Sequence, residues 1–110
     1  MKNMENNSLK FDYNDGVLRV AIVGEINHHR AVSVRQEIDE KIQELRPQNL
    51  VLDLADAPFM DSSGLGLIMG RRRTCAELSV EMALAGVSED IIKILRLTGL
   101  IREIEILQKI

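Results

Sequence analysis

The sequence predicts a single α/β domain with a mixed, mostly parallel sheet of about five strands, and three observations support this. The chain has 110 residues, of which 45% are hydrophobic, which is enough for one core and too little for two. Asn14-Asp15-Gly16 has the residue types of a hairpin turn and separates two apolar segments, so the first two strands should be antiparallel. Strand-like and helix-like segments then alternate, which favours right-handed parallel crossovers and the order β-β-α-β-α-β-α-β.

The first half of the chain contains the hairpin, one helix and a buried strand. The first strand is indicated by alternating apolar residues at Leu9, Phe11 and Tyr13. Residues 17–23 form the second strand, Asn27 can cap the following helix, and Pro47 ends it. The apolar residues of this helix recur at every third or fourth position: Ala31, Val34, Ile38, Ile42 and Leu45. Residues 1–7 are polar, so we expect them to be disordered or loosely ordered and the domain to span residues 8–110.

Residues 50–54 are a nearly continuous apolar run, as expected for a strand buried on both faces, and a second helix follows at about 63–78. Asp61 or Ser62 suits its N-cap. Its predicted core-facing stripe, interrupted by Arg72, consists of Leu65, Ile68, Met69, Cys75 and Ala76.

The last third of the chain should add a strand, a short helix and a final strand. The fourth strand is indicated by alternating Val80, Met82 and Leu84. Ser88 caps a helix from Glu89 to Leu97, and Gly99 follows its end. Ile104 and Ile106 between glutamates suggest a last strand, although residues 101–110 could instead be helical.

Charge and composition disfavour several classes of partner. A net charge of -3 argues against direct nucleic-acid binding or an anionic membrane as the main partner. We interpret the basic run Arg71 to Arg73 as mostly solvated, because successive helical residues point about 100° apart. No apolar stretch reaches the ~20 residues that span a membrane, and the polar start does not resemble a secretory signal. The sequence therefore predicts a cytoplasmic protein.

Metal and cofactor chemistry has little support in the sequence. Cys75 is the single cysteine and lies on the apolar stripe, so it is expected to be a buried thiol. One cysteine and two adjacent histidines do not provide spaced metal ligands. Gly64, Gly66 and Gly70 lie inside the helix and do not have dinucleotide-binding spacing. We expect no cofactor, although a nucleotide phosphate could dock weakly at the exposed helix start.

Ser62, Gly66 and Gly70 recur every four residues, so one flank of the second helix has almost no side-chain cover. Such a flank favours close packing on a neighbouring element, or a shallow groove that a partner backbone approaches near Ser62, and both can hold at once because the flank has two ends. The loops at residues 24–29 and 55–62 should meet beside it, since both leave the carboxyl ends of parallel strands.

The residue types of a hydrolase site also occur in the chain. Ser62, a histidine (His28 or His29) and a carboxylate (Asp53, Asp56 or Asp61) supply the residue types of a nucleophilic triad. The serine lacks the G-x-S-x-G turn that exposes such a nucleophile, so the sequence does not predict an enzyme.

Three segments carry a family resemblance: G-E-I-N-H-H-R-A at 24–31, F-M-D-S-S-G-L-G at 59–66 and L-T-G-L at 97–100. They resemble the anti-sigma-factor antagonists of the STAS domain family, and the resemblance covers nearly the whole chain. It implies a regulatory module without catalysis of its own. In that family the unphosphorylated antagonist binds an anti-sigma factor that is also a serine kinase, which frees the sigma factor. The resemblance implies that the kinase phosphorylates Ser62 and that a serine phosphatase reverses this.

Motif and geometry together predict a partner-binding surface. Its residues are Asn27, His28, Asp61, Ser62, Ser63, Gly66 and Gly70. The family commonly has an acidic residue at the position of Asn27. The alternative function is a STAS-type ligand-sensing or scaffold subunit of another regulatory assembly.

Overall fold

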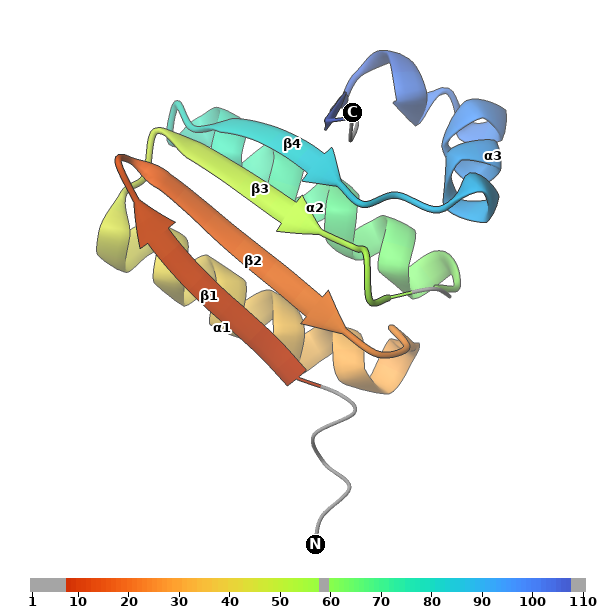
Figure 1. The fold of residues 1–110 in the computed structure, drawn as a ribbon, viewed down its shortest axis with the longest axis horizontal. Helices are drawn as coiled ribbons and strands as arrows, with labels where there is room; N and C mark the ends of the chain where they lie inside the picture. Colours follow the sequence, from red (N-terminus) through yellow and green to blue (C-terminus); the bar gives the residue numbers. More distant parts are fainter. Residues whose placement is uncertain (1–7, 58–59, 108–110) are drawn as a thin grey trace, which may run out of the picture.

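The computed structural model describes residues 8–57 and 60–107, which form a five-stranded sheet with helices (Figure 1). The strands are β1 (Ser8–Asn14), β2 (Val17–Val23), β3 (Asn49–Asp53), β4 (Glu81–Ala85) and β5 (Glu105–Leu107). The helices are α1 (His28–Leu45), α2 (Ser62–Glu77), α3 (Glu89–Thr98) and the short 3-10 helix η2 (Leu100–Arg102). The predicted fold class and element order are confirmed. The expectation for residues 1–7 lies outside the described residues.

The sheet has the strand order β1-β2-β3-β4-β5. β1 and β2 are antiparallel, while the three later pairings are parallel. Asp15 and Gly16 join β1 to β2 with φ angles of 52° and 80°. Two successive residues in this left-handed region make a turn whose twist matches the flanking strands, which explains the Asp-Gly sequence. Of the two alternatives for the C-terminal region, the strand is correct for residues 105–107.

The helix boundaries follow from local capping. Asn27 Oδ1 accepts a hydrogen bond from Arg30 N at 2.9 Å, and α1 ends at Leu45 with Arg46 as its C-cap, whose φ angle is 45°. Ser88 Oγ accepts from Ile91 N at 3.2 Å, and Gly99 closes α3 with a φ angle of 83°. Both predicted N-caps are therefore confirmed.

The core lies between the sheet and the pair of helices α1 and α2, which cover one face of it (Figure 1). Alternate residues of the central strands are essentially buried: Leu18, Val20 and Ile22 in β2, and Leu50 and Leu52 in β3. α1 contributes Val34, Ile38 and Ile42 to the same cluster, as its periodicity predicted.

The buried face of α2 differs from the predicted stripe. Its buried residues are Gly64, Leu67, Ile68, Arg71 and Cys75. Met69 is 46% exposed and Ala76 is exposed, so those two assignments were wrong. The reason lies at Gly64, where an added Cβ would come within 2.6 Å of Met60 Cβ. A glycine can mark the side of a helix that packs most closely, but it adds nothing to a hydrophobic pattern.

Arg71 also corrects the view that the basic run is solvated. It is only 4% exposed, and its Nε atom lies 2.8 Å from Asp39 Oδ1 on α1. Arg72 and Arg73 are exposed, as expected, and Arg72 pairs with Glu103 at 3.4 Å. One member of the run thus helps to join α1 to α2.

Candidate functional site at the start of helices α1 and α2

Two loops meet at the carboxyl end of the sheet, as the topology predicted. Ile26 and Met60 form an isolated parallel β-bridge between the β2–α1 and β3–α2 connections. Gly24 N also donates a hydrogen bond to Asp56 O at 2.8 Å. These contacts place the N-terminus of α1 beside the N-terminus of α2.

The two serines at the start of α2 differ in exposure and in hydrogen bonding. Asp61 is the N-cap, with Oδ1 accepting from Ser63 N at 2.8 Å. Ser62 is the first helical residue, is exposed, and makes no side-chain hydrogen bond to another described residue. Ser63 is partly buried, and its Oγ lies 3.4 Å from His28 Nδ1. Ser62 is therefore the more accessible of the two serines.

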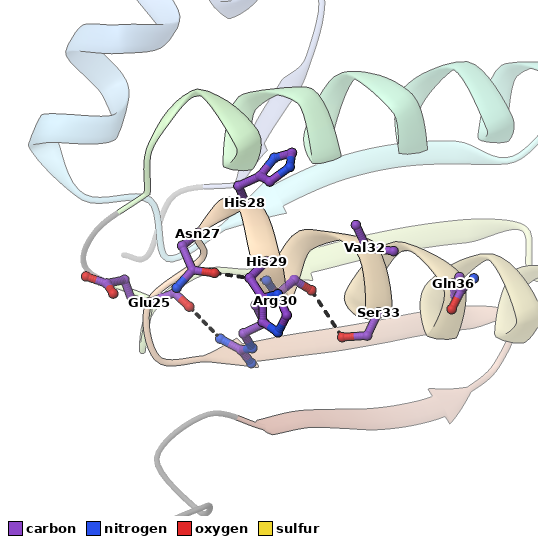
Figure 2. A pocket seen from close by; sticks show the side chains of 8 residues that line it. All are labelled: Glu25, Asn27, His28, His29, Arg30, Val32, Ser33 and Gln36. Carbon is purple, nitrogen blue, oxygen red and sulfur yellow. Dashed lines mark hydrogen bonds between the residues drawn. The ribbon is translucent and has the colours of Figure 1, made fainter.

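The neighbouring loop is held by Arg30 (Figure 2). Its guanidinium donates to Glu25 O at 2.8 Å and to Ser8 O at 3.0 Å, which ties the loop to the start of β1. Partial burial lowers the pKa of Arg30, and the nearby Glu37 carboxylate opposes this. Asn27, His28 and His29 lie in the same hollow.

The two histidines point in different directions. Figure 2 shows the His28 ring pointing toward α2 and the His29 ring pointing away from it. His28 contacts Ser63 rather than Ser62, and its ring makes no hydrogen bond to a carboxylate among the described residues. The hypothetical triad around Ser62 is therefore not assembled in this structure.

A groove of about 440 Å³ lies between α1 and α2 and begins at His28 and Ser63. We call it the α1–α2 groove. Gly66 and Gly70 line it, and a Cβ added at either position would meet no atom within 4 Å. The close-packing interpretation of these two glycines is therefore wrong, because they border an open groove; that a partner backbone occupies this groove stays a prediction.

Three arginines also line the α1–α2 groove, namely Arg35 from α1 and Arg71 and Arg73 from α2. Sequence reasoning missed this cluster. Two weak signals in the sequence point to it. Arg35 lies seven residues after His28, about two helical turns, so both are on one side of the first helix. Arg73 lies eleven residues after Ser62, about three turns, so both are on one side of the second helix. Neither spacing shows that these sides of the two helices face each other.

The predicted site residues thus divide into two groups. Asn27, His28, Asp61, Ser62 and Ser63 surround the two helix starts, while Gly66 and Gly70 lie along the groove. Within residues 8–57 and 60–107, no group of three or more His, Cys, Asp or Glu side chains could hold a metal ion. Among the same residues, no helix is both long enough and apolar enough to cross a membrane.

Comparisons with known proteins agree with this architecture. The family model for the STAS domain matches residues 8–110. The chain is 37% identical over 97 residues to an anti-sigma F factor antagonist of Paenibacillus polymyxa, covering 88% of this chain and 83% of that protein. It is 33% identical over 89 residues to an anti-sigma-B factor antagonist of Bacillus subtilis, covering 79% and 78% of the two chains.

A solved structure supports the fold independently of close sequence similarity. The phosphorylated form of the Bacillus cell fate determinant SpoIIAA superposes with a TM-score of 0.75 at 22% identity, over 94% of this chain and 92% of that one. On the family-model match and the relative at 37% identity, this chain belongs to the STAS domain family and, within it, to the anti-sigma factor antagonists.

Proposed function

We propose that this protein is a phosphorylation-controlled anti-sigma factor antagonist that acts in the cytoplasm. Its unphosphorylated form binds an anti-sigma factor with serine kinase activity and thereby releases the sigma factor. Phosphorylation of Ser62 switches the protein off, and a serine phosphatase restores it. The proposed contact surface comprises Ser62 and the residues predicted around it and along the groove.

The observation that carries this proposal is the environment of Ser62. It is exposed at the first position of α2, beside the loop that bears Asn27 and His28. Its neighbour Ser63 has its amide bonded to Asp61 and its hydroxyl near His28. A kinase would therefore reach Ser62 more readily than Ser63.

The same position explains how phosphorylation could act locally. A phosphate adds about -1.5 to -2 charges at pH 7, and the free N–H groups of a helix start favour that charge, so the domain should stay folded. In a complex, a partner carboxylate ~4 Å away would cost about 4 kcal/mol per unit charge pair at an effective dielectric constant near 20. This corresponds to roughly a thousandfold loss of affinity.

Binding to a purified partner tests the proposal. The probe is the anti-sigma F factor of Paenibacillus polymyxa, with the Bacillus subtilis anti-sigma-B factor as a second candidate. Wild type and Ser62→Ala should bind with similar Kd in the absence of ATP, and Ser62→Asp should bind much more weakly. With ATP, intact mass and site mapping should find one phosphate on wild type at Ser62 and none on Ser62→Ala.

Ser63→Ala is the matched control, because it removes the adjacent hydroxyl and leaves the proposed acceptor intact. It should still gain one phosphate. Equal affinity of wild type, Ser62→Ala and Ser62→Asp for a partner that binds would contradict the proposal. Phosphorylation that melted the domain, seen as a large fall in Tm, would contradict the local mechanism.

A further inference from the structure

The α1–α2 groove extends the Ser62 surface along α2. Ser62, Gly66, Gly70 and Arg73 are separated by four, four and three residues and therefore lie on one flank of the helix. Eleven residues of α-helix rise about 16 Å. The groove is thus about three helical turns long, with bare backbone in its middle and a cationic end away from the serines.

Its charge is opposite to that of the protein. Besides three arginines, its described lining contains His28 and neutral residues but no carboxylate. The chain as a whole carries a net charge of -3. The positive character of the groove is therefore a local arrangement built by two helices, and it favours an acidic ligand.

Arg71 makes the floor of the groove unusual. The side chain is 95% buried, yet neither Nε nor Nη1 makes a well-aligned hydrogen bond to another described residue. Nε has the Asp39 carboxylate at 2.8 Å, and the side chain of Asp39 is itself 34% exposed. Burial lowers the pKa of Arg71, Asp39 opposes this, and the nearby positive charge of Arg35 lowers it further. Arg71 therefore contributes positive charge to the groove lining, although its side chain is almost inaccessible to solvent.

We propose that the α1–α2 groove is a docking surface for an acidic segment of the partner that binds at Ser62. The segment lies along the Gly66–Gly70 flank and presents carboxylates to Arg35 and Arg73. Val32, which lines the same groove and is 47% exposed, supplies an apolar contact.

This inference rests on the proposed function for the identity of the partner, and it adds the chemistry by which the partner is recognised. It also gives phosphorylation a second effect. A phosphate on Ser62 places negative charge at the serine end of the groove, where it repels the near end of an acidic segment. The groove itself remains unchanged.

A peptide experiment tests the groove without the anti-sigma factor. The probe is a capped twelve-residue helical peptide of Glu and Ala, and the control peptide has Gln in place of Glu. At low salt the Glu peptide should shift the amide signals of Gly66 and Gly70 saturably, and the Gln peptide should not. Arg35→Glu and Arg73→Glu should each weaken this binding about tenfold, because reversal turns attraction into repulsion.

Arg96→Glu on α3 is the matched control, with the same change of charge outside the groove, and it should weaken binding less than twofold. Circular dichroism should show all three variants folded. Equal effects of the three reversals would overturn the proposal, as would an absence of shifts at Gly66 and Gly70. Tighter binding of inorganic phosphate than of the Glu peptide, or concentration-dependent shifts of the free protein, would instead assign the groove to a small anion or a second copy.

The anti-sigma factor arm separates the two proposals. If wild type binds the Paenibacillus polymyxa factor, Arg35→Glu and Arg73→Glu should raise its Kd about tenfold and reduce its salt dependence. If no anti-sigma factor binds while the peptide results hold, the proposed function fails and the acidic-segment site stands. If the factor binds and groove reversals change nothing, the docking surface is wrong and the proposed function stands.

Discussion

Gly66→Ala should make the protein more stable. Glycine in a helix interior costs about 1 kcal/mol relative to alanine, because it loses more backbone freedom on folding. At Gly66 an added Cβ meets no atom within 4 Å, so no steric cost offsets this gain. We expect the free energy of unfolding to rise by about 0.5–1 kcal/mol, and Tm by about 4–6 °C per kcal/mol for a domain of this size.

Gly64→Ala is the matched control on the same helix. Its Cβ would come within 2.6 Å of Met60 Cβ and 2.8 Å of Met60 Sδ. Overpacking of this kind costs about 1–3 kcal/mol, which equals or exceeds the gain in helix propensity. The variant should therefore be neutral or destabilised by up to about 2 kcal/mol.

Urea unfolding followed by circular dichroism measures both changes, with the m-value as a check that the unfolding transition is unaltered. The same Gly66→Ala protein should bind the anti-sigma factor or the Glu peptide more weakly, since the methyl group narrows the groove. A stability gain combined with a binding loss would separate the two roles of this residue. Destabilisation by Gly66→Ala, or stabilisation by Gly64→Ala, would refute the assignment of open and packed glycines.

Two further predictions concern the buried part of α2. Asp39→Ala should lower the free energy of unfolding by about 1–3 kcal/mol, below the usual range for a fully buried pair because Asp39 is partly exposed. In a double-mutant cycle with Arg71→Met, the double variant should lose less stability than the sum of the two single variants. Additive losses would show that Asp39 and Arg71 are not coupled. Cys75 should react slowly with a disulfide reagent at pH 8, because burial raises the pKa of its thiol from 9.0 to about 11. The stability gained by burying the neutral Cys75 thiol is present below pH 9 and is lost as pH rises through 11. Rapid labelling of the folded protein at pH 8 would contradict the expected slow reaction.

Local signals predicted much of the fold. The Asp15-Gly16 turn and the Asn27 and Ser88 caps depend on residues within a few positions, so the local sequence is enough to predict them. The meeting of the two loops followed from topology alone, since parallel strands bring their carboxyl ends to one edge.

The wrong predictions concern which residues of α2 are buried, and this depends on how α2 is rotated against its neighbours. Arg71 resembles its exposed neighbours in sequence, and only its ion pair with Asp39, 32 residues earlier, permits its burial. Gly64 and Gly66 are equally bare, yet one contacts Met60 and the other faces the groove. The arginine cluster needs both helices in place, because Arg35 and Arg73 come from different ones.

The strand order β1-β2-β3-β4-β5 also has a consequence for synthesis on the ribosome. Each strand pairs with the one made just before it, so no strand has to insert between two already joined. The groove uses residues 28–74 and can therefore assemble before α3 and β5 have left the ribosome. A newly made chain could present the α1–α2 groove while its last third is still being translated.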